Sequence, residues 1–212
     1  MVQQDGKYMG TNNFKQRQLV RIKEHIEAVV ASIDNAQNKI IEKIVNEITK
    51  AIKNGNKVLT AGNGGSACDA QHMAGEFIGK FMHERTALPA ICLCNDIAST
   101  YAIGNDYNFN LGLARALEGL AKKGDVLVAF STSGNAKNLV CAAKYAKKNG
   151  IKVILISGRN GGELYKQKLY DIAYLVKGSN STPRIQEIHE ILMHTICEEV
   201  ELNFKNIKSK IY

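Results

Sequence analysis

Five side chains that could take part in proton transfer or polar binding fall into two evenly spaced sets. His72 and Glu76 are four residues apart, so on a helix they share one face. Gln186, Glu190 and His194 repeat this spacing near the C-terminal end of the chain. An imidazole and a carboxylate on one face are suited to general acid–base catalysis. Each set alone is also typical of a solvated helix surface, so the neighbouring segments must decide between the two interpretations.

A glycine-rich segment comes shortly before His72. This glycine loop, residues 61–67, follows an apolar stretch and precedes a helical pattern that Ser66 could cap. Glycines allow a ligand to approach the backbone closely, and such a loop lies at the edge of a parallel sheet where ligands bind. The alternatives are a tight turn without a ligand and a dinucleotide-binding loop. The dinucleotide pattern wants an acidic residue about 20 positions later, and the nearest candidate, Asp96, comes too late.

A second loop is rich in hydroxyl groups. This hydroxyl loop, residues 131–135 (Ser-Thr-Ser-Gly-Asn), also follows an apolar strand and precedes a helical pattern. Hydroxyls at a helix N-terminus can bind a phosphate without a lysine, although a simple helix cap remains an alternative. The chain has no G-x-x-x-x-G-K-[ST] motif, so chemistry on nucleoside triphosphates is not expected.

Strands and helices alternate around these loops. Apolar periodicity predicts two helices between residues 13 and 54, with a break at 32–35. Five strands are then expected over 57–61, 88–94, 126–130, 153–156 and 172–176, and helices over 66–81, 108–121, 134–149 and 182–204, with a short one after Gly162. Continuous apolar strands between helices predict an α/β fold, a three-layer αβα sandwich with a central parallel sheet of flavodoxin-like or Rossmann-like type. We expect a single domain over residues 1–212, with a helical extension at 13–54 and poor order at 1–12.

The composition limits the class of protein further. No window has about 18 uninterrupted apolar residues and the N-terminus lacks a secretory pattern, so neither a membrane span nor secretion is expected. Five scattered cysteines indicate a reducing compartment, hence the cytoplasm, and Cys92 and Cys94 are assigned to packing. The net charge of +8 favours anionic substrates. No basic stripe interleaved with aromatic residues supports a nucleic-acid partner.

The last expected helix supplies the remaining motif, because Arg184-Ile185-Gln186-Glu187-Ile188-His189 is followed by His194. Together with the glycine loop, the His72/Glu76 pair and the hydroxyl loop, it resembles the sedoheptulose 7-phosphate isomerases, or phosphoheptose isomerases, which have the sugar isomerase (SIS) fold. The resemblance covers about residues 14–204. This combination is far more specific than any one of its motifs.

The resemblance implies an aldose–ketose isomerase that converts D-sedoheptulose 7-phosphate to D-glycero-D-manno-heptose 7-phosphate through an enediol(ate). That reaction is the first step towards the nucleotide-activated heptoses of bacterial lipopolysaccharide or capsule. The resemblance also implies a homotetramer with active sites at the subunit interfaces.

The residue roles rest on the same resemblance. Glu76 matches the base, and His194 matches the opposing acid or base. A Zn²⁺ ion, one per subunit, is implied with the ligands His72, Glu76, Gln186 and His194. Substrate contacts are implied for Asn63, Gly64, Gly65, Ser66, Asp106, Ser131, Thr132, Ser133 and Gln186. Since Gln186 and His194 lie about 12 Å apart along a straight helix, they would share a metal only by leaning inward, by a bend, or through two chains.

Two positions depart from the family pattern. Ala136 stands where many relatives have a serine that adds a phosphate contact, and Lys80 replaces an arginine, keeping its charge but losing its planar fork. Both bear on phosphate and sugar affinity rather than on proton transfer.

The main rival to this interpretation is an SIS-type protein that binds a replication initiator without catalysis. Such relatives lack catalytic residues at the positions of Glu76 and His194, whereas both residues are present in this chain. Two less favoured hypotheses are a sugar-phosphate-sensing regulator and a dinucleotide-dependent enzyme. A regulator of that kind would usually carry an added DNA-binding domain, and residues 14–54 lack an obvious one.

Overall fold

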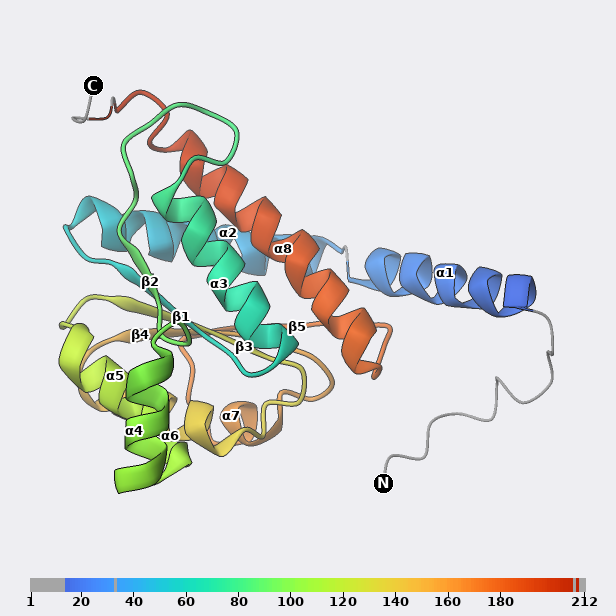
Figure 1. Ribbon diagram of the computed structural model, residues 1–212. Helices are drawn as coiled ribbons and strands as arrows, with labels where there is room; N and C mark the ends of the chain where they lie inside the picture. Colours follow the sequence, from blue (N-terminus) through green and yellow to red (C-terminus); the bar gives the residue numbers. More distant parts are fainter. Residues whose placement is uncertain (1–13, 33, 208, 210–212) are drawn as a thin grey trace.

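A five-stranded parallel sheet forms the centre of the molecule (Figure 1). The computed structural model describes residues 14–32, 34–207 and 209, so the expectation for residues 1–12 lies outside the described residues. The strand order is β2-β1-β3-β4-β5. The strands are β1 (Val58–Ala61), β2 (Ala90–Cys92), β3 (Val126–Ser131), β4 (Lys152–Ser157) and β5 (Ile172–Leu175). The parallel sheet predicted from the apolar runs is confirmed.

Helices cover both faces of this sheet, as Figure 1 shows. One face carries α2 (Asn35–Lys53), α3 (Gly65–Ile78) and α8 (Thr182–Leu202), and the other carries α5 (Gly112–Leu120), α6 (Lys137–Lys148) and α7 (Gly162–Lys166). Alternate residues of β3 serve the two cores: Val128 and Phe130 pack with the first set of helices, and Leu127 and Ala129 with the second. The three-layer αβα architecture is therefore confirmed.

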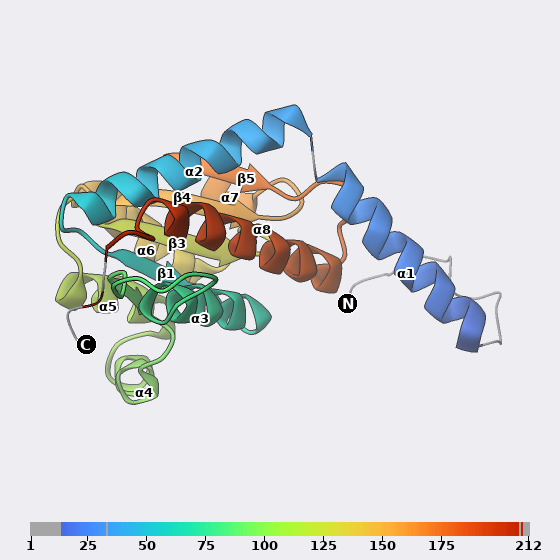
Figure 2. The same cartoon turned by 90° about the horizontal axis from the view of Figure 1, so that it is seen from above.

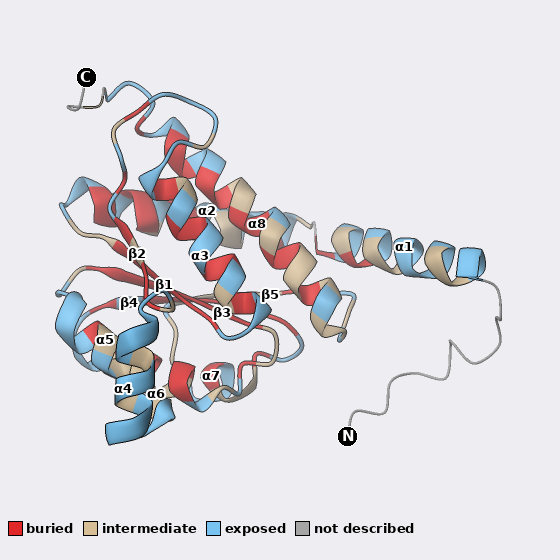
Figure 3. Cartoon of the chain, viewed as in Figure 1, coloured by how far each residue is buried: buried red, intermediate tan, exposed pale blue. Residues whose placement is uncertain are grey.

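Two helices lie outside these layers. α1 (Phe14–Ala31) projects from the body of the molecule in both views (Figures 1 and 2). Its apolar side chains are largely exposed, among them Leu19, Ile22 and Ile26. α4 (Ile97–Asp106) has no buried residue, and Figure 3 shows how little of either helix is covered. Apolar surface that one chain leaves uncovered is a feature of association sites.

Several boundaries differ from the expected ones. α4 was not predicted, because its short mixed sequence has no clear apolar stripe; Asp96 caps it by accepting a hydrogen bond from the Ser99 amide at 3.0 Å. β2 has three residues, fewer than expected, and α5 is shorter because the 3₁₀ turn Phe109–Leu111 precedes it. α6 begins after the hydroxyl loop rather than inside it. In the described part of the chain, no helix combines the length and the apolar character needed to cross a membrane.

Candidate active site

The glycine loop and the hydroxyl loop lie next to each other at the carboxyl edge of the sheet. Each follows one of two neighbouring strands, β1 and β3, which pair in register with Ala61 opposite Ala129. From β1 the chain continues to β2 on one side, and it returns with β3 on the other side. Such a reversal of strand order opens a crevice in which α/β proteins bind ligands. The structure thus brings both predicted loops to one ligand-binding position.

Close contacts require two glycines of the glycine loop. A Cβ on Gly62 would lie 2.0 Å from the carbonyl oxygen of Ser66, so the backbone could not close over a larger residue. A Cβ on Gly65 would lie 2.4 Å from Nε2 of Gln186. The Gln186 amide, near the start of α8, therefore lies against the loop. Gly64 rather than Ser66 occupies the cap position of α3, and the buried Ser66 lies in the first turn of the helix.

A pair of amides joins the glycine loop to the helix that follows the hydroxyl loop. The Nδ2 group of Asn63 donates to Oδ1 of Asn138 at 3.0 Å, and Nδ2 of Asn138 donates back to Oδ1 of Asn63 at 2.7 Å. Asn138 is buried in the first turn of α6 and its Oδ1 also accepts from the Leu139 amide. Asn138 was not predicted from the sequence, in which its one signal was its place just after the hydroxyl loop. The reciprocal pair fixes the spacing of the two loops.

The hydroxyls of the hydroxyl loop have different surroundings. Oγ of the buried Ser131 accepts a hydrogen bond from the Gly134 amide at 2.9 Å, so it shapes the turn. Thr132 and Ser133 are half-buried. Ala136, which caps α6, offers no side-chain hydrogen bond. No side chain caps α6, so the alternative that this loop is a simple helix cap is wrong. Oγ of Ser133 accepts a hydrogen bond from the Asn135 amide at 3.3 Å, which leaves the hydroxyl hydrogen of Ser133 to donate to a ligand.

An acid–base cluster forms where α3 packs against α8. Nε2 of His72 lies 3.1 Å from Oε1 of Glu76, and the rings of His72 and His194 meet edge to face with 5.0 Å between centroids. The structure brings His72, Glu76 and His194 together from two distant segments of the chain. His72 is exposed, while Glu76 and His194 are half-buried. The cluster thus offers two imidazoles and one carboxylate for proton transfer.

The cluster also has the donor set of a metal site. One ligand atom each from His72, Glu76 and His194 lies within 4.8 Å of the other two. Two imidazoles and a carboxylate suit zinc, and catalytic zinc sites often use three such ligands and leave one position for substrate or water. Gln186, the fourth expected ligand, lies against Gly65 of the glycine loop. The residues present therefore fit a metal ion held by three side chains.

Glu190 makes a contact to His72 that was not predicted from the sequence. Its Oε2 lies 2.9 Å from Nδ1 of His72, on the ring nitrogen that faces away from Glu76. Glu190 belongs to α8, one turn before His194, so the polar stripe of this helix was the available signal. The two ring nitrogens of His72 thus face carboxylates from two different helices.

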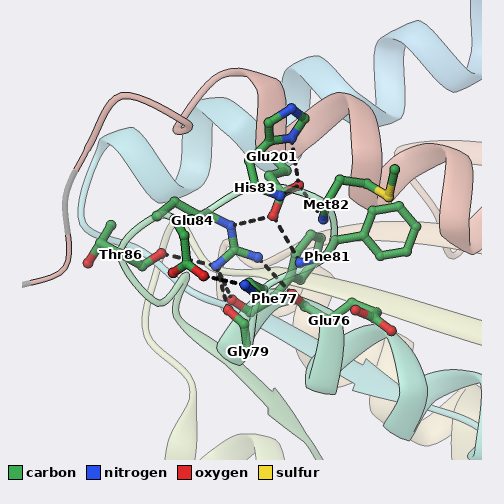
Figure 4. Close-up of polar contacts among 11 residues, drawn as sticks. Glu76, Phe77, Gly79, Phe81, Met82, His83, Glu84, Thr86 and Glu201 are labelled. Carbon is green, nitrogen blue, oxygen red and sulfur yellow. Dashed lines mark hydrogen bonds and ion pairs between the residues drawn. The ribbon is translucent and has the colours of Figure 1, made fainter.

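A buried ion pair holds the loop that follows α3. The guanidinium of Arg85 donates to the carbonyl oxygens of Glu76 and Phe77, and its Nε lies 3.2 Å from Oε1 of Glu201. The carboxylate of Glu201 accepts backbone N–H groups of Phe81, Met82 and His83 at 2.7–2.9 Å (Figure 4). Burial would raise the pKa of Glu201, but these donors outweigh it and the pKa falls below its ordinary value.

This loop in turn touches the acid–base cluster. The ring of Phe81 stacks on that of His194, with 5.6 Å between centroids and 27° between planes. Arg85 also binds the carbonyl of Glu76 itself, at 2.7 Å. The buried pair of Arg85 and Glu201 therefore positions both proposed proton-transfer residues. Neither residue was singled out from the sequence, because a lone Arg and a lone Glu far apart in a chain give no pairing signal.

Two further expectations from the sequence concern Asp106 and the cysteines Cys92 and Cys94. Asp106, at the end of α4, lines a groove of about 990 Å³ between α3, α4 and α5, and none of His72, Glu76 or His194 lines that groove. Within one chain the structure therefore does not bring Asp106 to the cluster. Cys94 packs behind the glycine loop, where its Sγ donates to the Gly62 carbonyl at 3.2 Å, and Cys92 is buried. Both contacts agree with the assignment of these cysteines to packing.

Comparison with known proteins identifies the family. The SIS domain model matches residues 23–158. The chain is 45% identical over 177 residues to the phosphoheptose isomerase of Aliarcobacter butzleri, covering 84% of this chain and 92% of that protein, and 44% identical over 188 residues to that of Nitratiruptor sp., covering 85% and 99%. A phosphoheptose isomerase structure from Francisella tularensis superposes with a TM-score of 0.85 at 32% identity, over 90% of this chain and 99% of that one. The corresponding structure from Neisseria gonorrhoeae gives 0.80 at 32%, over 90% and 100%.

Proposed function

Because this chain belongs to the phosphoheptose isomerases of the SIS-domain family, we propose that it converts D-sedoheptulose 7-phosphate to D-glycero-D-manno-heptose 7-phosphate. The observation that carries the proposal is the acid–base cluster of His72, Glu76 and His194. Its residues come from α3, which the glycine loop opens, and from α8, whose Gln186 lies against that loop. Isomerisation of a ketose to an aldose moves one proton between adjacent carbons and another between their oxygens. A carboxylate and an imidazole suffice for both transfers.

Glu76 is proposed as the base. Its carboxylate removes a proton from the carbon beside the ketose carbonyl, the electron pair of the C–H bond forms the enediol(ate), and the proton returns to the neighbouring carbon. His194, across the cluster, moves the proton between the two oxygens. The stacked Phe81 holds the His194 ring in place for this transfer. Each well-positioned acid or base contributes about 10²–10⁴-fold to the rate.

Binding of the substrate is assigned to the two loops. Thr132 and Ser133 would donate hydroxyl hydrogen bonds to the phosphate, while Ser131 shapes the turn. The backbone of the glycine loop and the Gln186 amide face the same crevice and would contact the sugar hydroxyls. The substrate contacts of Asn63, Gly64, Gly65 and Ser66 are proposed from their place in the fold. The side-chain amide of Asn63 is already hydrogen-bonded to that of Asn138.

We propose zinc as the metal and His72, Glu76 and His194 as its protein ligands. Two neutral imidazoles and one carboxylate form a looser site than four thiolates, as expected for a catalytic ion. A zinc ion bound there supplies Lewis acidity towards a carbonyl oxygen. Gln186 is proposed to contact the substrate rather than the metal, because its amide lies against Gly65.

The exposed apolar surfaces support a homotetramer. α1 presents Phe14, Leu19, Ile22, Ile26 and Val30 to solvent, and α4 presents Ile97 and Tyr101. Burial of such surface against other copies would remove apolar area from water, which favours association. The groove that Asp106 lines would lie at such an interface, so Asp106 is proposed to act in the assembly. Free cysteines at all five positions agree with a cytoplasmic location.

The test is to incubate the purified protein with sedoheptulose 7-phosphate and to follow the anomeric proton of the aldose by NMR. Unphosphorylated sedoheptulose is the matched control, because it lacks the group that the hydroxyl loop would bind. We expect turnover of the phosphate ester and little of the free sugar. Binding of a replication initiator protein without any turnover would favour the non-catalytic alternative.

A further inference from the structure

The carboxylate of Glu190 lies on the far side of the His72 ring from the proposed metal position. Nδ1 of His72 is 2.9 Å from Oε2 of Glu190, and Nε2 is 3.1 Å from Oε1 of Glu76. Among the described residues, Glu190 is outside the set whose ligand atoms lie within 4.8 Å of one another. Its position therefore suits a contact to the ring rather than a contact to the ion.

We propose that Glu190 is a positioning residue for the metal ligand His72. A histidine that binds a metal through Nε2 must keep its other nitrogen protonated, and a carboxylate that accepts the Nδ1–H fixes both this tautomer and the orientation of the ring. Glu190 offers such an acceptor at hydrogen-bond distance. The lone pair on Nε2 then points towards Glu76 and His194.

The place of Glu190 in the fold gives this contact a second effect. His72 is on α3, whereas Glu190 and His194 are one turn apart on α8. The hydrogen bond therefore ties the first ligand to the helix that carries another one. The edge-to-face contact between His72 and His194 depends on the same packing of the two helices. The side chain of His72 is partly exposed, so without Glu190 its ring would be free to rotate away from the cluster.

The inference rests on the proposed metal site, and its test measures metal affinity rather than turnover. Metal-free protein, prepared with a chelator, is titrated with zinc in the presence of a competing chromophoric chelator. The variants are Glu190→Ala, which removes the acceptor, and Glu190→Gln, whose amide oxygen can still accept the Nδ1–H. Glu198→Ala is the matched control, because it removes an exposed glutamate from the same helix.

We expect Glu190→Ala to weaken zinc binding about 10–100-fold, the usual effect of losing a partner of a metal-bound histidine. Glu190→Gln should lose less zinc affinity than Glu190→Ala, and Glu198→Ala should bind zinc as the unmodified protein does. Equal affinity of Glu190→Ala and the unmodified protein would overturn the inference alone. An unmodified protein that takes up no zinc would overturn the metal proposal together with this role for Glu190, while the isomerase assay without added metal would still decide the reaction.

Discussion

Replacement of Gly65 by alanine should displace the Gln186 side chain and slow turnover without unfolding the protein. The added Cβ would lie 2.4 Å from Nε2 and 2.7 Å from Cδ of Gln186. Ordinary contact needs about 3.4 Å or more, so the amide must move by about 1 Å. Gly65 is the first residue of α3 and has no positive φ, so the alanine itself brings no backbone strain.

The size of the effect follows from that displacement. A shift of about 1 Å in a substrate-positioning group can cost about 10²-fold in rate, which corresponds to about 2.7 kcal/mol of transition-state stabilisation. The assay is kcat/KM for sedoheptulose 7-phosphate, with the melting temperature of each variant measured beside it. We expect a loss of about 10²-fold and a melting temperature within a few degrees of the starting value.

A double-mutant cycle makes the reasoning refutable. If Gly65→Ala acts by displacing Gln186, it should cost little more in a Gln186→Ala background, because the displaced group is already absent. The double variant should then resemble Gln186→Ala alone. Losses that simply add would show that the two residues act independently, and the proposed contact between the loop and the last helix would be wrong as an account of function.

The remaining predictions concern the phosphate, the buried pair and the metal. Ser133→Ala should weaken the binding of a phosphorylated ligand by about 1–3 kcal/mol in calorimetry, and unchanged binding would remove Ser133 from the phosphate site. Glu201→Gln should lower the free energy of unfolding by about 3 kcal/mol at neutral pH, because it breaks a buried ion pair. The pKa of Glu201 is lower in the folded protein, so its stabilisation is present above the unfolded pKa of about 4.3 and is lost as the pH falls through the folded pKa. In chemical denaturation, the free energy of unfolding should therefore depend less on acid pH in the variant. The same pH dependence in both proteins would contradict this. Chelation should remove zinc and activity while circular dichroism is unchanged, His72→Ala should take up no zinc, and Cys92→Ala should take it up normally; full activity of demonstrably metal-free protein would refute the metal role.

Local patterns in the sequence were enough to predict the layers and the two loops. The apolar run of β3 and the glycines around Gly62 are short-range signals, and each dictates a local structure whatever the rest of the chain does. The four-residue spacing of His72 and Glu76 likewise placed them on one helical face. α4 was not predicted, because its sequence lacks an apolar stripe and the chain leaves its surface uncovered.

The contacts that complete the site could not be predicted in this way. The hydrogen bond between His72 and Glu190, the amide pair of Asn63 and Asn138, and the ion pair of Arg85 with Glu201 each join segments far apart in the chain. Such pairings depend on how α3, α6 and α8 pack, and no local propensity encodes them. The meeting of His72 with His194 was expected through the family resemblance rather than from spacing.

The most direct test of the central claim is isomerisation of sedoheptulose 7-phosphate in D₂O, followed by NMR with the unmodified protein and with Glu76→Gln. Proton transfer through an enediol(ate) lets the abstracted proton exchange with solvent. We predict that D-glycero-D-manno-heptose 7-phosphate forms with deuterium at carbon 2, and that Glu76→Gln slows its formation by at least about 10²-fold. Failure of the unmodified protein to form the aldose, or full activity of the Glu76 variant, would contradict the account.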